Sequence, residues 1–498
     1  MRSVPLVRVL LSAVISAAVL TGCGSGADHG APQSIAWGAC PPEFGTVVQC
    51  ARIDVPLDWD KPEGEKVSVG IDRLPAGDPD HRIGALVFNP GGPGGSGTEI
   101  VAAEGAHPGI FPAELRARFD LIGLDPRGIA TSRPDVRCDP ALQNKIPDFF
   151  PADAAAFDAM VAASREFGQS CRRLSGALLD HMDTVNVARD LEVVRQRLGG
   201  APLNYLGLSY GTEIGFEYAR LYPSNSRVLA LDGALVHSLP ASAMNVYESA
   251  AFEDSLNRFA AWCHIATECA LGTSDATAVV RDLTARARQT PLPAPGCADS
   301  GKCAPVVRAG DLLQNIQNGL LFKSPIPGIG LGGWPQLAGA LDQARRGDAS
   351  GLSPQTASDT EGGGLTVGCA EYRADFEGYP AFESQQILAA TIAPNTLGAN
   401  QSFSYIAQCQ GWPATFSDPP STAIAKPTIV PLLVNAIHDP STSYGWAHLF
   451  ASQVPNAVLL TRDGDGHTSF FQPGHTRDAI TRYLLDGTVP PAGTVLPD

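Results

Sequence analysis

The chain has 498 residues, of which 44% are apolar and 17% charged, a composition typical of a folded globular protein that excludes disorder for most of its length. Its formal net charge of −16 argues against a nucleic-acid partner, because an acidic surface repels phosphate groups. The 52 glycines and 41 prolines predict many loops and turns around an apolar core.

The N-terminal residues have the features of an export signal that ends at a lipid-attachment site. Basic residues precede an apolar run at 9–20, which is too short to span a bilayer but has the length of a signal-peptide core. The run leads into LTGC, in which Cys23 resembles the acylated cysteine of a bacterial lipobox. We expect a signal peptide at 1–22, a lipidated tether at 23–39, and a protein outside the cytoplasm that is held to the cell membrane by lipid alone, or secreted. The alternative is an ordinary signal cut nearby, with Cys23 a stray thiol.

The other ten cysteines form an even set that falls into pairs of sequence neighbours. An exported protein allows them to oxidise, and the chain has no C-x₂-C spacing, so we expect disulfides and no metal site. Sequence proximity is a weak guide to connectivity. The expected pairs are Cys40–Cys50, Cys138–Cys171, Cys263–Cys269, Cys297–Cys303 and Cys369–Cys409.

Apolar runs that alternate with amphipathic stretches predict an α/β fold with a mostly parallel central sheet. Short β-type runs at 47–56 and 67–74 come first. Continuous apolar runs, typical of strands buried on both faces, follow at 84–89, 119–125, 203–208, 228–232, 428–435 and 457–460. Helical spacing of apolar residues occurs between them, at 184–198 and 210–222.

The regular alternation of strand and helix stops after residue 233 and returns near residue 424. The residues between read as helices joined by loops rich in proline and glycine. We therefore expect one α/β domain, formed by residues 40–233 and 424–498, with a large and mainly helical cap inserted at 234–423.

The sequence GLSYG at 207–211 lies between a predicted strand and a predicted helix. Glycines on both sides let the backbone make the strained turn that raises a serine hydroxyl above the sheet, at the positive end of the following helix. A bare G-x-S-x-G occurs often by chance, but this position at a strand end gives it weight. Ser209 is the expected nucleophile.

A serine hydroxyl needs a general base, which a third group holds in place. Among the late histidines, His467 follows the last predicted strand in a glycine loop, where the base of such a fold belongs, whereas His448 and His475 read as surface residues. Asp439 follows the preceding strand and is the expected acid. Asp463 and Asp465 are closer to His467 in sequence, but residues so near in one loop rarely reach its Nδ1.

The oxyanion of such a reaction needs backbone N–H donors. One is expected from Tyr210, the residue after the nucleophile, and the other from Gly92 in the turn PGGPG that follows the strand at 84–89. This turn does not cradle phosphate, since the G-x-x-x-x-G-K-[ST] pattern is missing. We expect no cofactor.

Four sequence stretches together resemble the secreted tripeptidyl-aminopeptidase family, a branch of the prolyl-aminopeptidase-like α/β-hydrolase serine peptidases that is common among actinobacterial lipoproteins. They are NPGGPGGSG at 89–97, DLIGLDPRGIATS at 120–132, GLSYGTEIGFEYARLYP at 207–223, and the late Asp439 and His467. The resemblance runs from about Cys40 to the C-terminus. It implies an α/β-hydrolase fold and the release of short peptides, such as tripeptides, from free peptide N-termini through an acyl-enzyme.

An enzyme of this kind must bind the substrate ammonium, and the resemblance to a family with acidic residues near the cap points to Glu371, with Asp375 next. A surface carboxylate is an equally good reading of both. A carboxylesterase or lipase on the same scaffold, acting on a small ester, is the second hypothesis for function. A catalytically inactive binding protein is the third, which the intact set of Ser209, Asp439 and His467 opposes. We expect a monomer.

Overall fold

The structure, a computed structural model, describes residues 35–298, 300–326, 328, 332–356 and 362–498. The expected signal peptide, Cys23 and most of the tether lie outside these residues. Within the described part of the chain, no helix combines the length and the apolar character needed to cross a membrane.

Ten strands form one sheet in the order β1-β2-β3-β5-β4-β6-β7-β10-β11-β12. From β5 to β12 every neighbouring pair is parallel, whereas β1, β2 and β3 form an antiparallel edge. The predicted apolar runs become the central strands, because helices cover both of their faces. The strands are β1 (Gly38–Ala39), β2 (Gln49–Pro56), β3 (Lys66–Leu74), β4 (Gly84–Asn89), β5 (Phe119–Asp125), β6 (Leu203–Leu208), β7 (Ser226–Asp232), β10 (Leu432–His438), β11 (Val458–Asp465) and β12 (Val495–Pro497).

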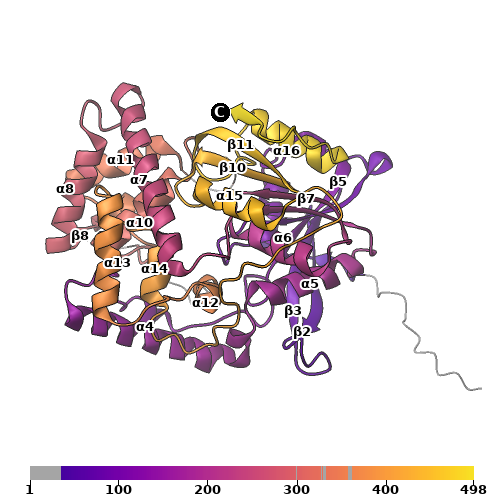
Figure 1. Ribbon diagram of the computed structural model, residues 1–498, viewed down its shortest axis with the longest axis horizontal. Helices are drawn as coiled ribbons and strands as arrows, with labels where there is room; N and C mark the ends of the chain where they lie inside the picture. The colour runs from indigo at the N-terminus through magenta and orange to yellow at the C-terminus, as the bar shows by residue number, and fades with distance from the viewer. Residues whose placement is uncertain (1–34, 299, 327, 329–331, 357–361) are drawn as a thin grey trace, which may run out of the picture. The chain divides into compact units, whose positions relative to one another are not determined.

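Helices cover the two faces of this sheet, which lies on the right in Figure 1. One face packs against α1 (Gly97–Ala106), α2 (Ala113–Arg118) and α16 (His475–Asp486), and the other against α5 (Thr184–Arg197), α6 (Tyr210–Leu221) and α15 (Tyr444–Gln453). The chain therefore has the three-layer arrangement of an α/β fold, and its active-site candidates follow the carboxyl ends of the parallel strands.

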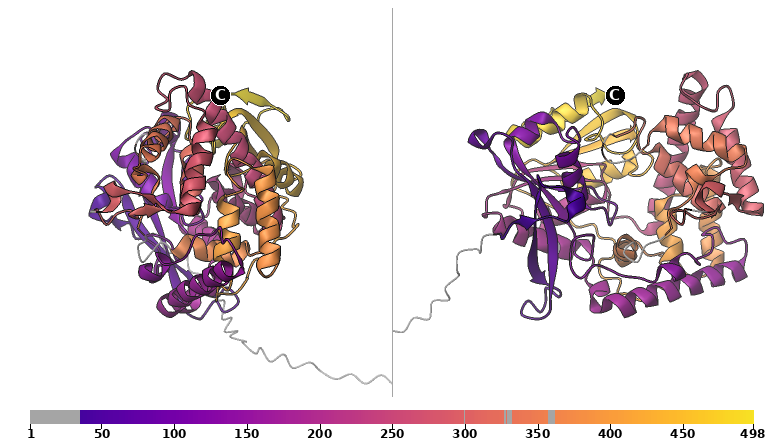
Figure 2. Two further views of the ribbon diagram at one scale, coloured as in Figure 1. Left: turned by 90° about the vertical axis from the view of Figure 1, so that its left-hand side faces the viewer. Right: turned by 180° about the vertical axis from the view of Figure 1, so that it is seen from behind.

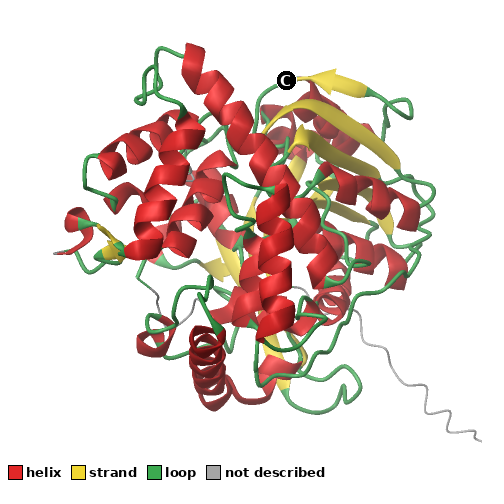
Figure 3. Cartoon of the chain, turned by 60° about the vertical axis from the view of Figure 1, so that its left-hand side comes forward, coloured by secondary structure: helices red, strands yellow, loops and turns green. Residues whose placement is uncertain are grey.

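A separate helical layer, the cap, is inserted between β7 and β10 and has an apolar core of its own. Figure 2 shows it beside the sheet, and Figure 3 shows its helices in front of the strands. Its elements are α7 (Ala241–Ile265), α8 (Ala276–Gln289), β8 (Leu292–Pro293), α9 (Pro295–Ala298), β9 (Val306–Val307), α10 (Ala309–Leu320), α11 (Trp334–Arg345), α12 (Gly362–Glu371), α13 (Tyr379–Ile392) and α14 (Gln401–Gln408).

Helix α4 (Ala154–Ser175), which the sequence assigns to the sheet domain, lies partly in the helical layer, below α13 and α14 in Figures 1 and 2. Its first half places Phe157 and Met160 in a cluster with Phe382 and Phe403 of the cap. Its second half places Phe167 in the core of the sheet domain. The helical layer thus includes residues that precede the insertion, because α4 is long enough to contact both layers.

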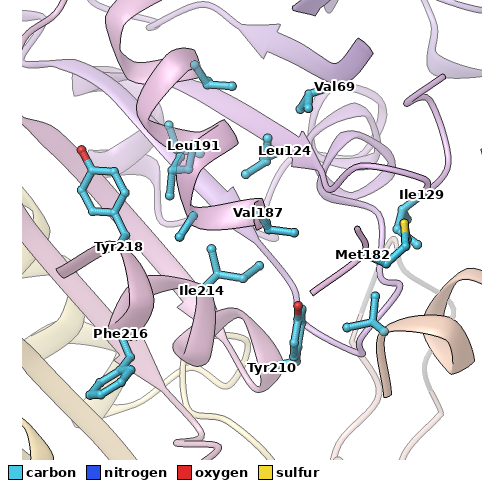
Figure 4. Close-up of a cluster of buried hydrophobic side chains, with 14 of the residues drawn as sticks. Val69, Leu124, Ile129, Met182, Val187, Leu191, Tyr210, Ile214, Phe216 and Tyr218 are labelled. Atoms are coloured by element: carbon cyan, nitrogen blue, oxygen red, sulfur yellow. The ribbon is translucent and has the colours of Figure 1, made fainter. Parts of the chain in front are cut away.

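Side-chain packing between α5, α6 and the sheet holds the helix that follows Ser209. Figure 4 shows Val187 and Leu191 of α5 beside Ile214 of α6, close to Leu124 of β5. All four are buried, so α6 cannot shift without opening the core.

Five disulfides are present, between the same neighbouring cysteines that the sequence pairs. They are Cys40–Cys50, Cys138–Cys171, Cys263–Cys269, Cys297–Cys303 and Cys369–Cys409. The last one joins α12 to the end of α14, so it fixes two cap helices that lie near the candidate site.

Candidate active site

Ser209 lies at the sharp turn from β6 to α6, with a φ of +55° that residues other than glycine rarely adopt. A Cβ at Gly207 would collide with Gly211 O, so the glycines of the motif allow the turn to close. The N–H of Ser209 donates to Asp232 O at 2.9 Å, which ties the turn to β7. The side chain is therefore held at the N-terminus of α6, where the helix dipole favours a negatively charged oxygen.

His467 and Asp439 lie together at the carboxyl ends of β11 and β10. His467 Nδ1 is 2.8 Å from Asp439 Oδ2, and both residues are buried. Asp439 also accepts hydrogen bonds from Ser441 N at 2.8 Å, from Thr442 N at 2.9 Å and from Thr442 Oγ1 at 2.8 Å. With Nδ1 directed at the carboxylate, Nε2 is the nitrogen left to take a proton.

The pKa of His467 reflects two opposed effects. Burial alone would lower the pKa of this imidazole, but the adjacent Asp439 carboxylate, together with those of Asp232 and Glu248, outweighs burial and raises the pKa above its ordinary value. His467 is therefore a stronger base than a solvent-exposed histidine, and its charged form is stabilised by Asp439.

The other histidines and acids considered from sequence have different surroundings. His448 on α15 and His475 at the start of α16 are exposed, and so is Asp463. Asp465 is buried, and its carboxylate pairs with Arg258 of α7 and with Lys323 Nζ, the latter at 2.9 Å.

The cap holds the loop that carries His467. The N–H of His467 donates to Leu321 O at 2.6 Å, just beyond α10. Two residues earlier in the same loop, Asp465 binds Arg258 and Lys323, and burial would raise its pKa but these two cations outweigh burial and lower it. We call the set of Arg258, Lys323 and Asp465 the cap clamp.

Asp232, at the end of β7, is a buried residue that the sequence reasoning missed. Its Oδ2 accepts from Ser469 N at 2.6 Å and from Phe470 N at 2.7 Å, and burial raises its pKa to about 6. It thus fixes the chain just after His467, while its carbonyl holds Ser209. An aspartate closing the apolar run VLALD was the available signal, since a carboxylate at a buried strand end needs a structural reason.

The two expected oxyanion donors lie next to Ser209. Tyr210 is the first residue of α6, so its N–H has no acceptor within the helix. The N–H of Gly91 is engaged by Asn89 Oδ1 at 3.0 Å, whereas that of Gly92 has no acceptor among the described residues. Gly92 also lines the space beside Ser209, so it is a better candidate for the second donor than Gly91.

Two cavities meet at Ser209 and share Gly92, Gln401 and Ser441. The first has a volume of about 30 Å³. Its other lining residues are Pro93, Leu235, Met244, Glu248, Tyr372, Ser402, Tyr405, Thr442 and Trp446. It is thus mainly apolar and aromatic, with a single carboxylate among the described residues that line it.

The second cavity has a volume of about 250 Å³ and includes His467. Its other lining residues are Pro90, Ile100, Leu208, Gln314, Gln317, Asn318, Leu321, Phe322, Thr468 and Phe471. We call the first the small cavity and the second the large cavity. His467 distinguishes them, because it lines only the large one.

The two carboxylates expected to bind an ammonium line neither cavity. Glu371 is fully buried, and its Oε1 accepts from Thr184 N at 2.5 Å. Burial together with the nearby Glu213 raises its pKa well above the ordinary value. Asp375 is exposed and accepts from Ser242 N at 3.0 Å, at the start of α7. In this packing α12 directs Glu371 toward the start of α5, and the role of the two residues in binding an ammonium stays a prediction.

Glu248 of α7 is the carboxylate that the small cavity does contain. Among the described residues it accepts from neutral donors only, namely Ser402 N at 2.9 Å, Ser402 Oγ at 2.5 Å, Gln401 N at 3.1 Å and Gln317 Nε2 at 2.8 Å. Burial raises its pKa above the ordinary value, although these hydrogen bonds oppose the shift. No sequence signal marked it, since α7 carries several acidic residues and their directions depend on how the cap packs.

No group of three or more His, Cys, Asp or Glu side chains in the described part of the chain is arranged to hold a metal ion. The arrangement of Ser209, His467 and Asp439 with two N–H donors is suited to acyl transfer, in which a serine attacks a carbonyl carbon.

Comparison with known proteins places this site in context. A family model described as "alpha/beta hydrolase fold" matches residues 84–299, and one described as "TAP-like protein" matches residues 395–496. The chain is 32% identical to the serine protease Hip1 of Mycobacterium tuberculosis, over 98% of this chain and 96% of that protein. It is 30% identical to the tripeptidyl aminopeptidase of Streptomyces coelicolor, over 94% and 86%, and 30% identical to carboxylesterase B of Mycobacterium tuberculosis, over 94% and 91%.

Proposed function

We propose that this chain releases short peptides from free peptide N-termini through an acyl-enzyme. The basis is that the chain belongs to the TAP-like family of α/β hydrolases and is a serine hydrolase. The observation that carries this proposal is the unequal pair of cavities at Ser209, only one of which includes His467.

In the proposed mechanism Ser209 Oγ attacks the scissile carbonyl carbon while His467 Nε2 takes its proton. Asp439 holds the imidazole by Nδ1 and stabilises the imidazolium that forms. The N–H groups of Tyr210 and Gly92 stabilise the tetrahedral oxyanion, and each such donor contributes about 3 to 4 kcal/mol to lowering the barrier. His467 then protonates the leaving amine, and a water molecule releases the acyl group by the reverse sequence.

The position of His467 gives the site a direction. Because His467 protonates the leaving nitrogen, the leaving portion of the substrate lies on its side of Ser209, in the large cavity. The acyl portion then lies in the small cavity, whose volume of about 30 Å³ is far below the 250 Å³ of the large cavity. Side chains of the cap must move for a peptidyl group to enter there. A restricted acyl side and a roomier leaving side suit removal of a short piece from the N-terminus of a longer chain.

Glu248 is the proposed partner of the substrate ammonium, in place of Glu371 and Asp375. A buried carboxylate with neutral donors only retains an uncompensated charge, and a cation that enters the same cavity compensates it. An ammonium at Glu248 would form a charge-assisted hydrogen bond of the strong class.

Replacement of Glu248 by glutamine tests the proposed function. We expect Glu248→Gln to reduce kcat/KM for free-amine peptides by a factor that corresponds to about 2 to 5 kcal/mol of lost transition-state stabilisation, because the ammonium loses its partner. The kcat/KM for N-blocked peptides should change little. The measurement is a fluorogenic panel of free-amine tripeptides, N-blocked tripeptides and short-chain acyl esters. Glu371→Gln is the matched control, an equally buried carboxyl outside the cavity, and should keep the preference for free amines. Equal losses of the Glu248 variant on free and blocked peptides would refute the assignment.

A carboxylesterase is the second candidate, supported by the likeness to carboxylesterase B and by the small apolar cavity. An ester needs the same serine, base and oxyanion donors but no partner for an ammonium. In the same panel an esterase would hydrolyse short-chain esters fastest and would be insensitive to Glu248→Gln.

We further propose that the protein is exported and held to the membrane through acylated Cys23, as the run at 9–20 and the LTGC sequence suggest. Two or more acyl chains hold a protein durably at a membrane. We expect Cys23→Ser to move the protein from the membrane fraction to the medium or to leave its signal uncut, as measured by detergent phase partitioning and by mass. Unchanged partitioning of the variant would show that acylation is not the anchor.

A further inference from the structure

We propose that the large cavity is a subsite for the leaving peptide, in which the side-chain amides of Gln314 and Asn318 on α10 bind the peptide backbone beyond the scissile bond. This inference rests on the proposed function, because the large cavity is the leaving side only if His467 protonates a leaving amine.

The first observation is the division of α10 into two faces. Its apolar residues are buried in the cap core, among them Leu312, Leu313 and Ile316. Gln314 and Asn318 are four residues apart, so they share the opposite face, and both line the large cavity. The helix therefore presents amide groups, and no charge, to the space beside His467.

The second observation is that these two amides are free to bind. The Nε2 of their neighbour Gln317 is already engaged, since it donates to Glu248 Oε1 at 2.8 Å and to Pro440 O at 2.9 Å. The side chains of Gln314 and Asn318 have no hydrogen-bond partner within the described residues, and neither is fully buried. Side-chain amides without hydrogen-bond partners at the edge of a catalytic cavity are suited to bind a ligand.

Another part of the cavity lining is apolar. Ile100 of α1, Phe322 and Phe471 line it, and the two phenylalanine rings meet edge to face with centroids 6.4 Å apart. None of the described lining residues is an Asp, Glu, Lys or Arg. The lining therefore offers apolar surface together with neutral hydrogen-bonding groups, a combination that suits a peptide in extended form.

The spacing of the amides matches the repeat of such a peptide. Residues four apart on a helix are separated by about 6 Å along its axis. Two residues of extended chain span about 7 Å, and successive peptide groups that face the same way recur at that interval. A carboxamide offers one acceptor and two donors, so each can pair with a peptide N–H or C=O. Gln314 and Asn318 can therefore bind two peptide groups of one extended leaving chain.

The test compares two substrates that share an N-terminal portion and differ only in what leaves. One carries an arylamide, such as aminomethylcoumarin, and the other continues as a peptide of three residues with an amidated C-terminus. Gln314→Leu and Asn318→Leu should each reduce kcat/KM for the peptide about fivefold, and the double variant about 30-fold, as expected for the loss of one and two ordinary hydrogen bonds. The kcat/KM for the arylamide should change by less than about twofold, because no hydrogen bond to a leaving peptide is lost.

Asn315→Leu is the matched control, because Asn315 lies on the same helix, donates to Asp311 O at 3.0 Å and lines no part of the cavity. It should leave the ratio between the two substrates unchanged. A second measurement is competitive inhibition by the leaving tripeptide amide, whose inhibition constant should rise in the double variant by the same factor as kcat/KM falls.

The outcomes are distinct. Equal losses on arylamide and peptide, or no loss on either, overturn the subsite while the preference for free amines still stands. If the wild-type protein hydrolyses esters but no peptide, then both the subsite and the proposed exopeptidase function are wrong.

Discussion

Alanine at position 209 is expected to abolish hydrolysis, with kcat lower by on the order of 10⁶-fold, because the acyl-enzyme cannot form without the serine oxygen. What remains would come from the oxyanion donors and from substrate binding. Covalent labelling by a serine-directed phosphonate should disappear as well. Intact mass before and after exposure to the reagent measures this directly, and activity on the tripeptide panel measures the loss in rate.

The control for this variant is Ser452→Ala, at an exposed position of α15 where the hydroxyl only donates to Leu449 O. That protein should label as fully as the wild type. The melting temperature of Ser209→Ala should also stay close to that of the wild type, since alanine experiences the same positive φ as serine. Stoichiometric labelling of Ser209→Ala would mean that the nucleophile lies elsewhere.

Asn in place of Asp439 should cost on the order of 10⁴-fold in kcat, because an amide that donates to Nδ1 favours the wrong tautomer of His467. The variant should also change the pH profile. His467 must be neutral to act as base, so activity falls as the pH drops through its pKa, which Asp439 raises. Without that carboxylate, burial remains and lowers the pKa, so the falling limb of kcat/KM should move to lower pH.

Asp465→Asn separates this role from mere proximity in sequence. Asp465 precedes His467 by two residues, but its carboxylate binds Arg258 and Lys323 of the cap clamp. The variant Asp465→Asn should lose less kcat than Asp439→Asn, and the acid limb of its pH profile should stay nearly in place. A larger loss for Asp465→Asn, accompanied by a shifted limb, would make Asp465 the acid of the triad.

Sequence reasoning reached the residues whose positions follow from local chemistry or from chain order. A glycine-flanked serine between strand and helix can form only a tight turn, and the loops after β10 and β11 meet at one edge of a parallel sheet. The chain order therefore brings Asp439 and His467 to the same edge of the sheet.

The cap residues could not be assigned in the same way. Glu248 and Glu371 are both acidic residues on helices that are otherwise mostly apolar, and nothing in sequence tells which one faces Ser209. The direction of each carboxylate depends on how α7 and α12 rotate when they pack. Glu371 accepts a hydrogen bond from Thr184 N, and Glu248 accepts one from Ser402 N at the start of α14. The position of α4 could not be read from the sequence for a related reason, since a helix of 22 residues is long enough to contact both layers.

The cap clamp bears on how this fold can be altered by recombination. The insertion between β7 and β10 supplies Arg258, Lys323 and the carbonyl of Leu321, and the host domain supplies the loop at 463–467 that they hold. A chimera that received another relative's insertion with its own loop unchanged would place an unpaired, buried Asp465 two residues from its base. We therefore expect an exchanged insertion to keep the base in place best when the loop that it holds is exchanged with it.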